Sequence, residues 1–214
     1  MDEPSASSKT AANADANGTP DPYMTATVAE FLDDLAARTP APGGGAAAAV
    51  TCAMAAGLVE MAASFASATG LEHVRERAHD LRLEVSSLAY ADGRAYGVVL
   101  EALRMEKGDQ RTACLDEAVS GAIAVPMQVL ELASEVATLA ADVAETGNRN
   151  LEGDALAGSL LAEAAARSAA TLAQMNMSML SRHAVAEAHL ERMRPALAKA
   201  TRARERAVTA YAHV

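Results

Sequence analysis

Two glycine-bearing segments and one isolated carboxylate are the parts of this 214-residue sequence whose residue types could do chemistry. The first segment reads Thr-Pro-Ala-Pro-Gly-Gly-Gly over residues 39–45 and runs into alanines. A glycine-rich run that enters a helix presents free N–H groups at the positive end of the helix dipole, which suits a carboxylate, carbonyl or phosphate. A flexible linker has the same composition, so this segment alone leaves both interpretations open. It is not a P-loop, because the Lys and Ser/Thr of that motif do not follow.

The second segment, Gly-Asn-Arg-Asn-Leu-Glu-Gly-Asp over residues 147–154, places Asn148, Asn150 and Asp154 within reach of one another. An Asn side chain both donates and accepts hydrogen bonds, which is what recognition of a heterocycle with mixed edges requires. The alternative is an Asx turn in which Asp154 caps a helix that begins at Ala155. For Asp154 taken by itself, the capping interpretation is the favoured one.

The isolated carboxylate is Asp92, within the sequence LAYADGRAY. On a buried helix face it would be costly unless it were paired or functional, but the spacing fits an exposed position equally well. The histidines give no ligand set, since His73 and His79 lie six residues apart, as do His183 and His189. We therefore expect no metal site, and no nucleophile elbow is present.

The elements that must position these residues are helices, because apolar residues recur at helical spacing and no alternating strand pattern appears. Thr27 and Glu30 form a capping box, and Pro126 kinks one helix by removing a backbone donor. The sequence predicts an all-α bundle of roughly five to seven long, partly kinked helices. Residues 1–23 are expected to be a disordered tail, and 24–214 a single helical domain. The expected helices run from 27 to the first glycine segment, 46–68, 71–106 with a joint near Gly93, 111 to the second glycine segment, 155–185, and on to 212.

The composition limits the classes of partner. A formal net charge of -10 argues against nucleic acid, and the longest apolar runs are Ala-rich and broken by Gly, Thr or Ser, which argues against a membrane span. No basic and apolar leader begins the chain, so the cytoplasm is expected. With 3% aromatic residues and abundant Ala, the core is weak for its size. We therefore expect a homodimer or higher homo-oligomer formed by symmetric helix packing.

Four stretches in this order resemble the formiminotetrahydrofolate cyclodeaminase and methenyltetrahydrofolate cyclohydrolase family over about residues 24–212. They are FLDDLAARTPAPGGGAAAAV, ADGRAYGVVLEALRMEK, AVP and GNRNLEGD. The resemblance implies an all-helical oligomer whose ligand is a tetrahydrofolate derivative. It also implies an enzyme that uses neither a metal nor a redox cofactor.

The resemblance also implies roles for particular residues. Asp92 falls at the family's acid–base aspartate, and Lys107 at a basic position suited to the glutamate carboxylates of the substrate. Both glycine segments would then meet at one cleft. The implied folate-binding residues are Pro42, Gly43, Gly44, Gly45, Lys107, Gly147, Asn148, Asn150, Asp154 and Asn176.

The chain departs from the family pattern at five pocket positions, which are Ala46, Tyr90, Glu106, Gly153 and Leu172. Because polar groups are lost, we expect hydrolysis of 5,10-methenyltetrahydrofolate to formyltetrahydrofolate rather than deamination. Three alternatives stay open. They are formiminotetrahydrofolate cyclodeaminase activity, action on 5,10-methylenetetrahydrofolate, and a silent protein that binds folate or acts as a scaffold.

Overall fold

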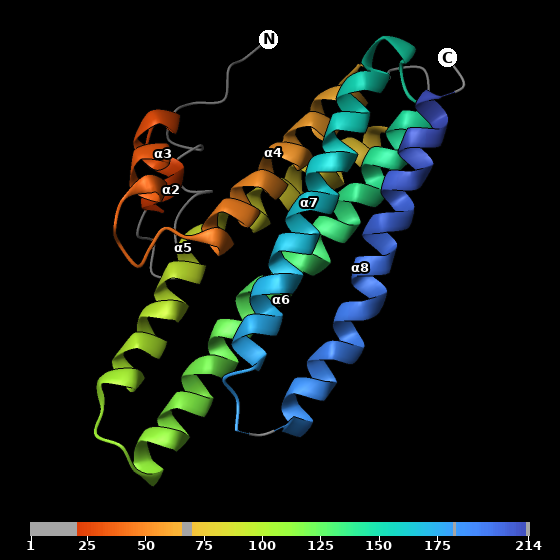
Figure 1. Ribbon diagram of the computed structural model, residues 1–214. Coiled ribbons are helices and arrows are strands. Elements are labelled where there is room, and N and C mark those ends of the chain that lie inside the picture. The colour runs from red at the N-terminus through yellow and green to blue at the C-terminus, as the bar shows by residue number, and fades with distance from the viewer. Residues whose placement is uncertain (1–20, 66–69, 182, 213–214) are drawn as a thin grey trace.

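The computed structural model describes residues 21–65, 70–181 and 183–212, so most of the expected tail lies outside the described residues. Within this part of the chain there are seven α helices, one short 3-10 helix and no strand, which confirms the all-α prediction (Figure 1). The helices are α2 (Pro22–Thr25), α3 (Val28–Ala36), α4 (Gly44–Ser64), α5 (Glu72–Arg104), α6 (Asp109–Thr146), η1 (Arg149–Leu151), α7 (Glu152–Met177) and α8 (His183–Tyr211).

The end of the expected tail is ordered, which corrects its predicted boundary at residue 23. The carboxylate of Asp21 accepts hydrogen bonds from the N–H groups of Tyr23 and Met24 and so caps α2. The Tyr23 ring then packs edge-on against Phe31 of α3 and Tyr90 of α5, with centroids 5.8 and 5.6 Å apart. These contacts fix α2 and α3 beside α4 and α5, outside the main bundle (Figure 1).

The helix boundaries follow local chemistry with a few differences from expectation. The Thr27–Glu30 capping box is present at the start of α3. No joint occurs at Gly93, because α5 continues unbroken to Arg104. Helix α7 begins at Glu152, so Asp154 lies in its first turn and does not cap it as expected.

Helices α4 and α7 pack closely because small residues meet along their contact. A Cβ atom on Gly158 would lie 3.3 Å from the carbonyl oxygen of Ala55, and one on Gly44 would lie 3.5 Å from the Leu172 methyl groups. The residue order along the two helices is therefore opposite, and α7 runs antiparallel to α4. Many of the alanines of both helices are completely buried, so each contributes little area but allows a short distance between axes.

Two helices, α4 and α6, are long and apolar enough to cross a membrane by length and composition, contrary to the prediction that none would be. Half of the residues in the apolar window of α4, and 61% of those in α6, are buried inside the bundle. Such burial is typical of the central helices of a bundle.

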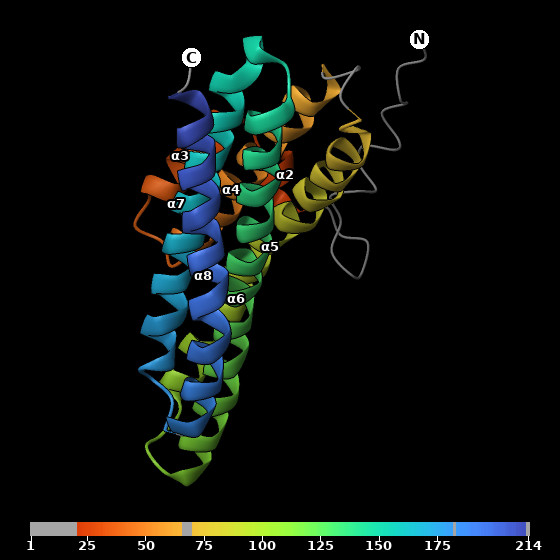
Figure 2. The same ribbon diagram turned by 90° about the vertical axis from the view of Figure 1, so that its right-hand side faces the viewer.

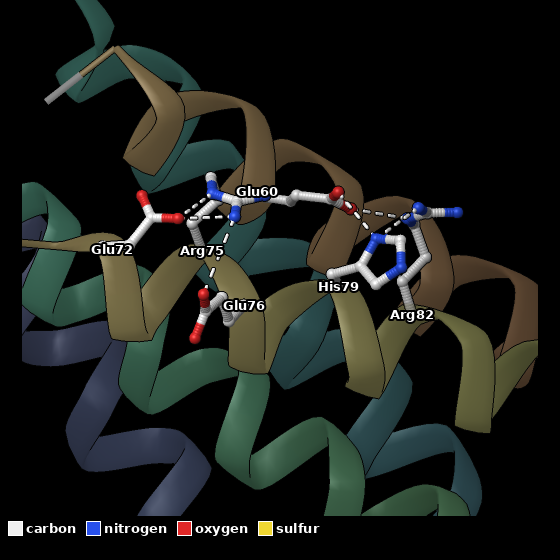
Figure 3. A network of polar contacts seen from close by, with 6 residues as sticks. All are labelled: Glu60, Glu72, Arg75, Glu76, His79 and Arg82. Atoms are coloured by element: carbon white, nitrogen blue, oxygen red, sulfur yellow. Dashed lines mark hydrogen bonds and ion pairs between the residues drawn. The ribbon is translucent and has the colours of Figure 1, made fainter. Parts of the chain in front are cut away.

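The bundle is elongated, with the α5–α6 turn at one end and η1 at the other (Figures 1 and 2). On its side, polar side chains tie α4 to α5 (Figure 3). Glu60 of α4 accepts a 2.8 Å hydrogen bond from Nε of Arg82 and lies 2.9 Å from Nδ1 of His79, both on α5. Burial opposes ionisation of Glu60, but these contacts outweigh it and lower the pKa of its carboxyl.

Candidate functional site

A cleft of about 260 Å³ opens where the first glycine segment enters α4. Side chains and backbone from α4, α5, α6 and α7 line it together with the preceding loop. It therefore brings the first glycine segment together with Asp92 and Asn176, which lie far apart in the sequence. The lining residues are Pro40, Ala41, Gly43, Gly44, Gly45, Asp92, Gly93, Tyr96, Ala122, Leu172, Met175 and Asn176.

The Asp92 carboxyl group lies directly against the backbone of Gly45. A Cβ atom on Gly45 would be 2.1 Å from both Cγ and Oδ1 of Asp92, so any other residue here would force the carboxyl group or the helix to move. Burial raises the pKa of the Asp92 carboxyl above its ordinary value. No other described residue hydrogen-bonds to this carboxylate. An unpaired carboxylate of this kind can act as a base or hold a cation.

The start of α4 supplies the cleft with hydrogen-bond donors. Gly43 caps the helix without a side-chain bond, and the first backbone bond at this end runs from the N–H of Ala47 to the oxygen of Gly43, at 3.0 Å. The N–H groups of Gly44, Gly45 and Ala46 therefore have no partner within the helix, as at any helix N-terminus. The cleft thus offers both N–H donors and a carboxylate.

Asn176 enters the cleft from α7 and is anchored to α6. Its amide nitrogen Nδ2 donates a 2.8 Å hydrogen bond to the carbonyl oxygen of Ala122. Both residues line the cleft. The amide oxygen of Asn176 accepts no hydrogen bond from a described residue, so it is available as an acceptor.

The second glycine segment lies elsewhere in the protomer, so the expected single cleft does not form within one chain. Helix α7 begins at Glu152 and reaches the cleft only at Leu172, twenty residues later, which at 1.5 Å per residue is about 30 Å. Figure 1 places η1 at the end of the bundle, away from the start of α4. The antiparallel packing of α7 on α4 is the physical reason for this separation.

Local structure in the second segment follows the alternative interpretation in part. The side chain of Asn148 accepts a 3.0 Å hydrogen bond from the N–H of Asn150, as in an Asx turn. Asn150 is exposed, while Gly147, Asn148 and Asp154 are half-buried. Gly147 lines a separate cavity of about 820 Å³ with Arg149 and residues of α6 and α8.

The remaining predicted folate-binding residues, Pro42 and Lys107, do not line the cleft. Pro42 is buried in the loop whose neighbours Ala41 and Gly43 line the cleft. Lys107 is exposed in the turn after α5. Twelve residues separate Asp92 from the last residue of α5, about 18 Å along the helix, so Lys107 could meet only an extended tail of a ligand.

One of the five departures from the family pattern changes the lining of this cleft, namely Leu172. Ala46 is completely buried in the core, and Tyr90 packs against Tyr23. Glu106 and Gly153 are exposed and lie outside the cleft lining.

Several lining residues were not predicted as site residues from the sequence, among them Tyr96, Ala122 and Met175. Tyr96 follows Asp92 by four residues and so shares its helix face, which is a spacing that could have identified it. Met175 directly precedes Asn176 and is 62% exposed. Among the described residues, no group of three or more His, Cys, Asp or Glu is arranged to hold a metal ion.

Comparison with known proteins finds relatives that match nearly the whole described chain. A family model for formiminotransferase-cyclodeaminase matches residues 27–195. A methenyltetrahydrofolate cyclohydrolase from Methylorubrum extorquens is 35% identical over 193 residues, which cover 84% of this chain and 93% of that protein. A formimidoyltransferase-cyclodeaminase from Rattus norvegicus is 30% identical over 138 residues, covering 58% of this chain but 26% of that protein.

A solved structure has the same fold. The crystal structure of a formiminotetrahydrofolate cyclodeaminase from Thermotoga maritima superposes with a TM-score of 0.80 at 29% identity, covering 87% of this chain and 96% of that one. Both the extent of the family match and the identity to a relative of similar length lead to one conclusion. The chain belongs to the formiminotransferase-cyclodeaminase family.

Proposed function

We propose that this protein hydrolyses 5,10-methenyltetrahydrofolate to formyltetrahydrofolate. The observation that carries the proposal is the unpaired Asp92 carboxylate, packed against Gly45 in a cleft whose lining contains no Lys, Arg or His. The methenyl bridge is an amidinium cation, so a carboxylate without a counter-ion attracts it. The relative from Methylorubrum extorquens bears the name of this activity.

The reaction requires a base and a proton carrier close to the bridging carbon. Asp92 accepts a proton from a water molecule as the water oxygen bonds to that carbon. The same carboxyl then returns that proton to the departing ring nitrogen as the carbon–nitrogen bond breaks. The remaining hydroxyl proton of the former water is released to solvent, which leaves a neutral formyl group on the other nitrogen. Because burial raises its pKa, Asp92 is a stronger base than an exposed aspartate.

Leu172 favours hydrolysis over cyclodeamination. Cyclodeamination needs a proton donor for the departing ammonia and a polar contact to hold the formimino nitrogen. The wall of the cleft next to Gly44 is the Leu172 isobutyl group, which offers neither. Deamination remains the second candidate, because the structural relative from Thermotoga maritima is a cyclodeaminase by name.

The assay is the decay of methenyltetrahydrofolate absorbance above its spontaneous rate, with ammonia release from formiminotetrahydrofolate measured in parallel. We expect the first to be fast and the second to be at background. Ammonia release without methenyl hydrolysis would replace the proposal by deamination. Calorimetric folate binding with neither reaction would favour a methylene substrate or a silent binding protein.

The cleft is too small for a whole folate, since pockets for ligands of that size usually exceed about 300 Å³. We propose that it holds the reacting ring and that the tail continues along the groove between α5 and α6. Ala95, Val98 and Met105 line that groove, and it leads toward Lys107 at the end of α5. Glu101 and Glu117 also line the groove and would repel the carboxylates of the tail. These carboxylates therefore have to extend past both glutamates to reach Lys107.

The oligomer we propose is a homodimer that pairs the outer face of α4 and α7. This α4–α7 face consists of Ala47, Thr51, Met54, Leu160, Ala164, Ser168 and Thr171, which recur at helical spacing. Met54 is 53% and Leu160 47% exposed. The only charged residues on these helices after their first turns are Glu60, Glu163 and Arg167, which bond to α5 or α8 or to each other. A long face without charges fits a second copy of itself better than a charged partner.

The oligomer is tested by sedimentation of the wild type and of Met54→Glu. We expect a wild-type dimer at micromolar concentration and a monomeric variant, because the variant would bury a charge at the centre of the interface. Leu32→Glu is the matched control, since Leu32 is 55% exposed on α3 and is not part of the α4–α7 face. A monomeric wild type, or a dimeric Met54→Glu variant, would contradict the proposed interface.

A dimer across this face also gives the second glycine segment a place in the site. A two-fold axis perpendicular to the helices, near Met54, exchanges the ends of the face and brings residues 147–154 of one copy toward the Asp92 cleft of the other. Mixed dimers of Asp92→Asn and Asn148→Ala should then regain about half of the wild-type activity, because one of the two sites is intact. Full activity of Asn148→Ala alone, or inactive mixed dimers, would reject this arrangement.

A further inference from the structure

Pro126 leaves one backbone carbonyl of α6 without its helical partner. In an α helix the N–H of residue 126 would donate to the carbonyl oxygen of residue 122, and proline has no N–H. Ala122 is 4% exposed, so water cannot easily replace the missing donor. An unsatisfied buried carbonyl is destabilising, and a folded protein normally supplies another donor.

The donor that the fold supplies is the amide of Asn176, whose Nδ2 lies 2.8 Å from the Ala122 oxygen. Because a carbonyl oxygen can only accept, the bonded atom must be the amide nitrogen, and the orientation of the whole amide is fixed. The amide oxygen is then the polar atom left over, and Asn176 lines the same cleft as Asp92. The carbonyl freed by Pro126 therefore determines which atom Asn176 presents to a ligand.

We infer that Pro126 is a positioning residue for the reaction in this cleft, an inference that rests on the proposed folate function. It acts through Asn176, whose oxygen accepts a hydrogen bond from an N–H group of the bound pteridine ring. With the ring held at this point, the one-carbon bridge is kept beside Asp92. A helix that was regular at position 126 would give Ala122 a backbone partner, which would compete with the amide for the same oxygen and loosen its orientation.

The test compares Pro126→Ala with Pro195→Ala as a matched control. Pro195 also lies inside a helix, α8, but it is exposed, and no residue of α8 lines the cleft. Both variants should melt at or above the wild-type temperature, because each restores a helical N–H. Pro126→Ala alone should raise KM for methenyltetrahydrofolate and weaken binding of 5-formyltetrahydrofolate, the stable probe, by about tenfold. Wild-type KM and binding in Pro126→Ala would overturn the inference.

A second measurement tests the link between the two residues without activity. Asn176→Ala should lower the melting temperature in the wild-type background, because it leaves the Ala122 carbonyl unsatisfied. In the Pro126→Ala background the loss should be much smaller, since the restored backbone N–H serves that carbonyl. Equal losses in the two backgrounds would also overturn the inference. If the wild type neither converts nor binds any folate, the proposed function fails together with the positioning role, and the thermal coupling then reports only on the helix.

Discussion

Replacing Gly45 by alanine should remove most of the activity of this protein and leave most of its stability. The new Cβ atom would lie 2.1 Å from Cγ and Oδ1 of Asp92 and 2.3 Å from Oδ2. Ordinary carbon contacts are about 3.5 Å, so the carboxyl group or the start of α4 must move by roughly 1.4 Å. In either case Asp92 leaves the position from which it can reach the substrate.

The two effects should differ in size. Overpacking costs about 1–3 kcal/mol, and the helical preference for Ala over Gly offsets up to about 1 kcal/mol of it. The free energy of unfolding should therefore fall by at most about 3 kcal/mol, which is less than the roughly 5–15 kcal/mol of an ordinary domain and leaves the protein folded at room temperature. A displacement of about 1 Å at a reacting group can reduce turnover about a hundredfold, and we expect a loss of that order in kcat/KM.

Gly57→Ala is the control, since Gly57 lies on the same helix outside the cleft lining and its Cβ would lie 3.6 Å from Cδ of Arg82, an ordinary contact. That variant should keep activity within a few-fold of wild type and unfold at the same or a higher temperature. The assays are methenyl hydrolysis and thermal unfolding followed by circular dichroism. If Gly45→Ala retains wild-type activity, Asp92 does not act from the position described and the proposed mechanism is wrong.

Three further perturbations test separate parts of the argument. Asp92→Asn should reduce turnover about a hundredfold yet raise the melting temperature at pH 7. Burial raises the pKa of the Asp92 carboxyl above 3.8, so the cost of its charge to stability grows as the pH rises through the folded-state pKa. The gain in melting temperature of the variant should therefore shrink as the pH falls toward 3.8. Lys107→Ala should raise KM about two- to fivefold with kcat unchanged. The control Lys199→Ala, on α8, should leave both KM and kcat unchanged. Equal KM values in the two variants would show that the tail does not follow α5. Glu60→Gln should reduce stability at pH 7 by about 0.5–1 kcal/mol, and because the folded-state pKa of Glu60 is lowered, urea unfolding should find this difference lost as the pH falls through that pKa.

The positions of the helices could be predicted because the signals were local. The prolines and glycines between residues 39 and 45 end one helix and begin another, and Thr27 with Glu30 forms the expected capping box. Residues 21–23 were misassigned because their order comes from tertiary contacts. The Tyr23 ring packs between Phe31 and Tyr90, and no short-range pattern encodes that contact.

The site was predictable only where its residues meet within one chain. Asp92, Gly45 and Asn176 come together as expected, although they belong to three helices. The segment around Asn148 does not join them, because the register of α7 against α4 sets its distance from the cleft. That register depends on which small residues fit together, such as Gly158 against Ala55, and a run of alanines leaves many alternatives nearly equal.

Several residues that oppose regular folding lie at this cleft or beside it, although others, such as Pro195 in α8, lie elsewhere. Gly44 and Gly45 begin α4 without a side-chain cap, Pro126 removes a bond from the centre of α6, and Asp92 is a partly buried carboxylate without a described partner. Each is unfavourable for stability alone, and chance alone would scatter such features along the bundle. Their position beside Asn176 agrees with the function proposed for this cleft. The triple variant Gly45→Ala, Asp92→Asn and Pro126→Ala should therefore have more regular helices at the cleft but no activity.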